Sequence, residues 1–232
     1  MNNAFHGCIN LSGTLTIPAS VTYIGEGPFT ECHFTEYIIE GGNNSYYAVE
    51  DGVLYNADKT TLIQFPIEKS ANNFTLPDSV KTIGAEAFVK CNGLTGEIVL
   101  PENITTIGGS AFFRCDRFTS ITLPASLNTI NSSAFYYCES LNTIRVECST
   151  ISSNGSDGSD AFIGCNNLKT VFISSPEIAS KLTSRTALFY LINAAETVYI
   201  AESAASSLPT EFASMFSEVI PSDQSGYRKY TA

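Results

Sequence analysis

The chain has 232 residues, of which 44% are hydrophobic and 15% charged, and its formal net charge is −11. This apolar content is typical of a folded chain and excludes a disordered one. The negative charge argues against nucleic acid or an anionic membrane surface as a partner, because phosphate binding requires a basic surface. No apolar run reaches the roughly 18 residues of a membrane-spanning helix, so we expect no membrane insertion.

One pattern recurs along most of the chain. The segments Cys91–Cys115 and Cys115–Cys138 share the form C-x-x-L-x-x-I-x-L-P-x-S-V-x-x-I-G-x-x-A-F-x-x-C. A short unit that returns with its apolar positions in register is the signature of a solenoid. A single unit leaves its apolar face exposed, and stacked units bury it, so we expect a column of repeated core positions.

Each part of the unit predicts a local structure. Ile121 and Leu123 alternate with polar residues, which is the period of a strand with one buried face. Pro124 ends that strand because proline has no N–H for a ladder. Leu127 and Ile130 are three residues apart and fit a short helical turn or a tight coil. The next position holds Gly25, Gly84, Gly108 or Asn131, which predicts a left-handed corner there.

In chain order, the first unit is already under way at Ala4-Phe5, so we expect this N-terminus to be an artificial boundary or a natural truncation. The segment 43–66 breaks the period. Asp51-Gly52 lies there between two apolar runs, which is a strong hairpin signal, and Asn56 to Lys59 form a second turn. We therefore predict an inserted antiparallel hairpin or meander.

After the insert the register resumes and continues to Ile173. Beyond Pro176 the pattern changes. The spacing of apolar residues predicts a helix over 177–193, a strand over 197–200, a second short helix over 208–217 and an extended end over 223–232. We expect one domain, with a solenoid over 1–175 and a helical C-terminal cap over 176–232.

The repeated motif resembles the BspA-like class of leucine-rich repeat proteins, and residues 4–173 carry the resemblance. The inserted segment is similar to a hairpin often found in this class. The resemblance implies an α/β repeat fold, a leucine-rich-repeat solenoid with a parallel strand ladder. It also implies a surface or secreted bacterial protein, with adhesion to host extracellular-matrix proteins as the associated function.

The cysteines and acidic residues give weaker signals. Six of the seven cysteines occupy the repeat position and Cys148 does not, and we expect a column of buried thiols more than disulfides. Asn154, Asp157 and Asp160 lack the spacing of a known calcium loop, so we interpret them as a polar loop. We recognise no catalytic motif, metal site or cofactor site, and we expect no enzyme activity and no cofactor.

The outward side of the strand ladder is the predicted binding surface. Stacked repeats make an extended, exposed sheet there, and aromatic or aliphatic residues on it indicate partner contacts. The alternative is that these residue types merely suit a strand. The leading hypothesis is a non-catalytic protein-binding module, with a structural spacer or a carbohydrate-binding module as alternatives. The predicted contact residues are Thr16, Ile38, Thr75, Val99, Thr122, Arg145, Phe172 and Tyr199.

Overall fold

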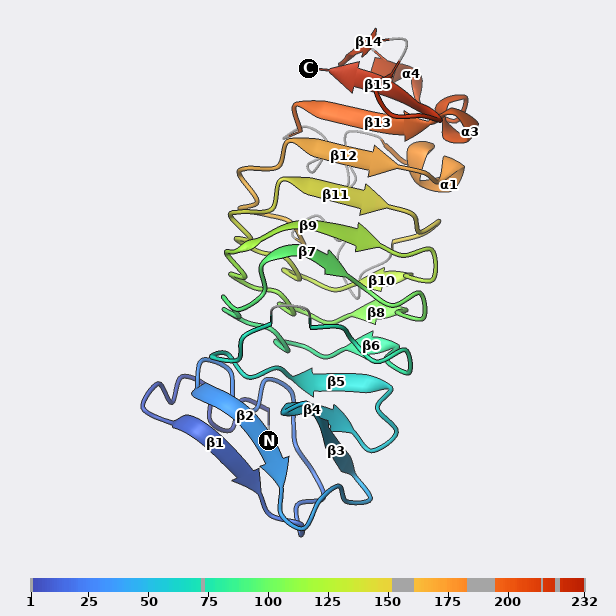
Figure 1. Ribbon diagram of the computed structural model, residues 1–232. Helices are drawn as coiled ribbons and strands as arrows, with labels where there is room; N and C mark the ends of the chain where they lie inside the picture. The colour runs from blue at the N-terminus through green and yellow to red at the C-terminus, as the bar shows by residue number, and fades with distance from the viewer. Residues whose placement is uncertain are drawn as a thin grey trace.

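The computed structural model describes residues 2–71, 74–151, 161–182, 195–213, 215–219 and 222–231. Its strands and helices follow one another along a solenoid that rises from the N-terminal to the C-terminal end (Figure 1). They are β1 (Ser12–Ile17), β2 (His33–Ile39), β3 (Tyr47–Glu50), β4 (Val53–Asn56), β5 (Thr61–Gln64), β6 (Thr82–Ile83), β7 (Gly96–Val99), β8 (Thr106–Ile107), β9 (Phe118–Leu123), β10 (Thr129–Ile130), β11 (Thr143–Val146), β12 (Thr170–Ile173), α1 (Pro176–Ala179), β13 (Thr197–Ala201), α3 (Glu202–Ala205), α4 (Thr210–Ala213), β14 (Ser217–Val219) and β15 (Tyr227–Thr231).

The strands form two parallel ladders instead of one. The predicted strands of the L-x-x-I-x-L slot pair in the order β7-β9-β11-β12-β13, while β1 and β2 form a separate two-stranded sheet. A second ladder is β5-β6-β8-β10, in which β6, β8 and β10 are short Thr-Ile pairs. Figure 1 shows its strands running opposite to those of the first ladder, because the chain returns across each turn.

The prediction for Leu127 and Ile130 was therefore only half right. Leu127 closes a tight turn by donating its N–H to the carbonyl of Pro124 at 3.0 Å. Ile130 lies instead in strand β10, paired with β8. A two-residue strand is too short to show alternation in the sequence, and stacking on its neighbours is what makes it a strand.

The insert forms the predicted meander. Strands β3 and β4 pair antiparallel, and β4 pairs antiparallel with β5. Asp51 and Gly52 make the turn between β3 and β4, and both have positive φ, at 48° and 70°. Strand β5 then pairs in parallel with β6, so the meander continues directly into the second ladder.

Phenylalanines of the repeat form a continuous stack that is buried except at Phe162, which is partly buried. The rings of Phe88, Phe112, Phe135 and Phe162 follow one another with centroids 4.9–5.1 Å apart and planes within 4° of parallel. The backbone supports the same column, because the N–H of Phe112 donates to the carbonyl of Ala134 in the next turn at 2.7 Å. The repeated alanine is fully buried beside each ring, where a larger side chain has no room.

The predicted left-handed corner lies two residues later than expected. Gly84 and Gly108 do not have positive φ, whereas Glu86, Ser110 and Ser133 have φ of 53–59°. This conformation turns the backbone N–H toward the next turn: Ser110 donates to the carbonyl of Ser132 at 3.0 Å. The inter-turn hydrogen bond offsets the strain of a non-glycine residue in this region, which costs about 1–2 kcal/mol.

Glycine is needed at position 108 for a different reason, which is close approach of the neighbouring turn. A Cβ on Gly108 would lie 2.5 Å from the backbone nitrogen of Ala85. The same atom on Gly84 would lie 2.8 Å from the carbonyl oxygen of Leu62. The repeated glycine therefore sets how tightly the second ladder stacks.

The C-terminal section caps the solenoid with strands as well as helices. Strand β13 extends the first ladder as predicted, and β15 pairs with it antiparallel, which places the extended end of the chain in the sheet. The helices α1, α3 and α4 have four residues each. The predicted 177–193 helix is not continuous, because α1 ends at Ala179 and residues 180–182 are not helical. Residues 183–194 lie outside the described residues. The predicted 208–217 helix is shorter, since β14 begins at Ser217.

The core divides into two clusters. The larger one follows the stacked turns from the meander to the C-terminal strands. A smaller one, which includes Phe29, Phe34, Tyr37 and Leu54, lies beneath β1 and β2. The division coincides with the insert, where the first ladder is interrupted between β2 and β7.

Replacing Phe112 with alanine should lower the free energy of unfolding by roughly 3–5 kcal/mol, because the ring is 1% exposed and is stacked on both sides. Chemical denaturation followed by circular dichroism measures this loss. The matched control is Phe113→Ala, next in the chain but only partly buried, which should cost clearly less. Equal losses at the two positions would contradict the assigned register.

Gly108→Ala should destabilise the fold by roughly 1–3 kcal/mol, since its Cβ would overlap backbone atoms that cannot move without separating two turns. Gly109→Ala is its neighbour and control. There the nearest atom to an added Cβ is the carbonyl oxygen of Ser132 at 3.5 Å. Gly109→Ala should leave the free energy of unfolding unchanged, or raise it by about 0.4–1 kcal/mol because alanine lowers the conformational entropy of the unfolded chain. Thermal unfolding of the pair decides whether close packing requires the glycine.

Candidate functional site

The structure aligns most of the predicted contact residues on one side of the first ladder. Pairing registers place one residue from each strand in a single row, and a shorter row lies on the two-stranded sheet. The long row is Val99, Thr122, Arg145, Phe172 and Tyr199, and the short row is Thr16 and Ile38.

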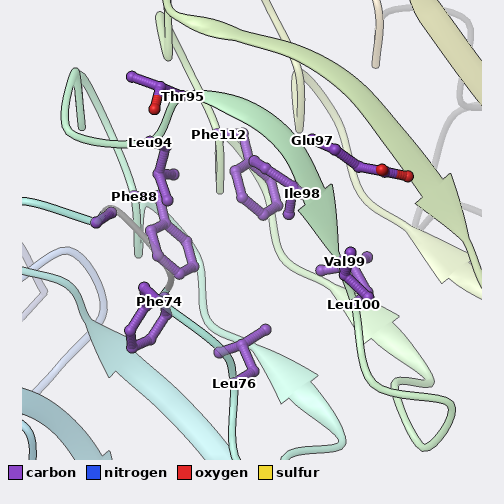
Figure 2. Close-up of a pocket in the computed structure, with 11 residues that line it drawn as sticks. Phe74, Leu76, Phe88, Leu94, Thr95, Glu97, Ile98, Val99, Leu100 and Phe112 are labelled. Atoms are coloured by element: carbon purple, nitrogen blue, oxygen red, sulfur yellow. The ribbon is translucent and has the colours of Figure 1, made fainter.

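Thr75 does not belong to either row. It lies in a coil between the meander and β6, although it is exposed. The neighbouring Phe74 and Leu76 line a small cavity of about 40 Å³ together with Leu94 and Ile98 (Figure 2). The strand predicted here is therefore absent, and β2 and β7 are both edge strands.

Phe172 and Tyr199 are buried, with 5% and 6% of their surfaces exposed, so the expectation that they face solvent was wrong. Their rings stack with centroids 4.6 Å apart, and the guanidinium of Arg145 lies 3.8 Å from the centroid of Phe172. Tyr227, from strand β15, packs edge-on against Phe172. The sequence predicted only that the end of the chain is extended, and it did not place that end beside β13. The burial of the two rings was therefore not predicted.

Polar contacts also hold the C-terminal segment with β15 against Tyr199. The hydroxyl of Tyr199 donates to Asp223 at 2.5 Å, and Lys229 lies 3.5 Å from the other oxygen of that carboxylate. Burial, together with this hydrogen bond, raises the pKa of Tyr199. The hydrogen bond from Tyr199 lowers the pKa of Asp223. The C-terminal end of the row is thus a packed, charge-balanced surface.

The N-terminal part of the face remains open. Ile38 is 42% exposed on β2, and Val99 is 66% exposed on β7. Glu36 and Glu97 are exposed on the same two strands, and Glu36 accepts a hydrogen bond from the Thr14 hydroxyl at 2.9 Å. Each of these two exposed aliphatic side chains therefore lies near a carboxylate on an edge strand, one in each sheet.

A second surface was missed by the sequence analysis. A groove of about 540 Å³ follows the second ladder and is lined by Thr61, Thr82 and Thr106 along its strands, with Tyr23 and Glu26 at one end. The three threonines are in register from β5 to β8. The signal in the sequence is a threonine directly before the isoleucine of the repeat, as in K-T-I-G at 81–84 and T-T-I-G at 105–108.

The repeat cysteines are free thiols, and five of the six are buried as predicted. Each buried Sγ donates to a phenylalanine carbonyl of the preceding turn; for Cys115 and Phe88 the distance is 2.9 Å. Cys8 is exposed, contrary to expectation, because it lies in the first turn of the described chain. Cys148, outside the repeat position, is also buried, and burial raises the pKa of its thiol to about 11.

Two further observations concern metal binding and membrane-spanning helices in the described residues. The described residues contain no cluster of three or more His, Cys, Asp or Glu able to hold a metal ion. The polar segment with Asn154, Asp157 and Asp160 lies outside the described residues. Among the helices of the described ranges, none has the length and apolar character needed to cross a bilayer.

Comparison with known proteins identifies the family. The sequence matches the BspA type leucine-rich repeat region in six copies, over residues 1–70 and 65–190. The chain belongs to the BspA-type leucine-rich repeat family. No curated protein matches the sequence.

Solved structures of bacterial leucine-rich repeat proteins share the fold. The pneumococcal vaccine antigen PcpA is 30% identical, with a TM-score of 0.65 over 75% of this chain and 42% of that one. A leucine rich cell surface protein from Faecalibacterium prausnitzii is 26% identical, with a TM-score of 0.62 over 85% and 50%. A protein from Eubacterium ventriosum is 27% identical, with a TM-score of 0.61 over 71% and 43%. This BspA-type chain spans half or less of each of these structures.

Alkylation of the native protein should modify Cys8 rapidly and the six buried cysteines far more slowly, since a thiol that is buried and protonated is a poor nucleophile. Mass spectrometry after a short iodoacetamide pulse gives the label at each position. The same pulse in guanidinium chloride is the control and should label all seven. Rapid native labelling of Cys115 would contradict the buried thiol column.

Proposed function

We propose that this BspA-type chain is a non-catalytic binding module of a bacterial surface protein, and that it binds a protein through the open outward face of β1, β2, β7, β9 and β11. The observation that carries the proposal is the exposure of Ile38 and Val99 on that face. Exposed aliphatic side chains beside polar groups favour a contact surface, because the buried part of an interface is depleted in charge and its rim is polar.

The electrostatics of the face favour a particular kind of partner. Glu36 and Glu97 flank the two aliphatic side chains, and the whole chain carries a net charge of −11. A partner with an apolar patch bordered by lysine or arginine would match this surface and would be attracted to it over long range. A polyanion would be repelled, which supports the exclusion of nucleic acid.

The likeness to other surface proteins supports the location. The Faecalibacterium protein is described as a cell surface protein and PcpA as a vaccine antigen. We infer that this chain is also displayed outside the cell, where host extracellular-matrix proteins are the candidate partners. A sugar site built on Phe172 and Tyr199 finds no support, because rings that are 5% and 6% exposed offer no face for stacking.

The double variant Ile38→Asp with Val99→Asp should weaken binding to the partner by about tenfold or more, as expected when two interface anchors are lost. Surface plasmon resonance against immobilised fibronectin and fibrinogen measures the effect. Both side chains are exposed, so the variant should unfold at the wild-type temperature.

The control is Ile163→Asp, an equally exposed isoleucine in the turn after Phe162, away from both strand rows. It should bind like wild type. Equal weakening by both variants would place the contact elsewhere. No saturable binding by the folded wild type would contradict the proposal and favour a spacer that displays other domains.

A further inference from the structure

The groove along the second ladder presents a row of hydroxyl groups. Thr61, Thr82 and Thr106 occupy the same position on β5, β6 and β8, and they line the groove. Adjacent strands of a sheet lie about 4.7–4.9 Å apart, so the hydroxyls recur at that interval. None of these three hydroxyls has a hydrogen-bond partner among the described residues, so each can both donate and accept.

Three main-chain N–H groups beneath the groove are already bonded between turns. The N–H of Gly84 donates to Leu62, that of Gly108 to Ile83 and that of Asn131 to Ile107, all at 2.8–2.9 Å. An extended peptide lying in the groove therefore cannot pair with these N–H groups as a new strand, since they are used between turns. A ligand must be recognised by side chains.

The groove is also lined by one exposed aromatic side chain and by a single charged side chain. Tyr23, from the turn before Gly25, is 68% exposed at the rim. The lining residues include no lysine, arginine or histidine, and Glu26 is the acidic residue among them. Phosphate, sulfate and carboxylate ligands would find no counter-charge here, so the surface suits a neutral molecule.

We propose that this groove binds a neutral linear polysaccharide. The threonine hydroxyls would pair with successive sugar hydroxyls, and the Tyr23 ring would pack against the apolar face of one sugar. A ladder that repeats at a fixed interval fits a polymer that also repeats, and the groove volume of about 540 Å³ is that of a ligand site. This surface is separate from the strand face proposed to bind protein, so either proposal can fail without the other.

The experiment is isothermal titration calorimetry with hexasaccharides of β-1,4-linked glucose, mannose and xylose and of α-1,4-linked glucose. Wild type should bind at least one of them. Thr82→Val with Thr106→Val keeps the side-chain shape and removes two hydroxyls, and should weaken that binding by roughly tenfold or more. Tyr23→Ala should weaken it as well.

Matched controls exist on the other faces. Thr143→Val with Thr170→Val removes two hydroxyls in register on the first ladder, and Tyr46→Ala removes another exposed ring. Both controls should bind the hexasaccharide like wild type, and thermal unfolding should show that all variants are folded. Binding that is lost in the controls, or unchanged in the groove variants, would overturn the proposal. Failure of wild type to bind any of the four hexasaccharides would also overturn it, as would groove-dependent binding of gelatin peptides alone.

Discussion

The structure depends on hydrogen bonds between successive turns at the buried phenylalanine column. The N–H groups of Phe88, Phe112 and Phe135 each donate to an alanine carbonyl of the next turn, and the cysteine thiol of that turn donates to the phenylalanine carbonyl. Both polar groups of the phenylalanine are thereby paired in the core, where an unpaired group would cost about 1–3 kcal/mol. The ring stack requires phenylalanine and the thiol bond requires cysteine, while the alanine between them is small enough to be fully buried.

This stacking creates two surfaces of different character. The first ladder carries long strands whose outward residues vary from turn to turn, and its C-terminal end is covered by β15. The second ladder carries the four-residue β5 and then the two-residue strands β6, β8 and β10, with a threonine at the same position of each. A varied surface suits recognition of an irregular partner such as a folded protein. A uniform one suits a polymer that repeats along its length.

The interruption by the meander matters to both surfaces. It removes one strand from the first ladder, which leaves β2 and β7 as edges, with Ile38 and Val99 exposed near them. It also supplies β5, the first strand of the second ladder, and so places Thr61 in register with Thr82. A long insertion is tolerated because it completes a turn with its own paired strands, and few backbone groups are left unpaired.

The sequence alone determined the solenoid, the register of the first ladder from β7 to β13 and the meander, because these follow from local alternation and from turn residues such as Asp51-Gly52. The row from Val99 to Tyr199 was predicted residue by residue for the same reason. Only the tertiary structure decided which of that row is exposed. Burial of Phe172 and Tyr199 depends on β15, which is distant in the chain and arrives by antiparallel pairing. The second ladder was likewise decided by stacking, since a Thr-Ile pair becomes a strand only when the next turn supplies its hydrogen-bond partners.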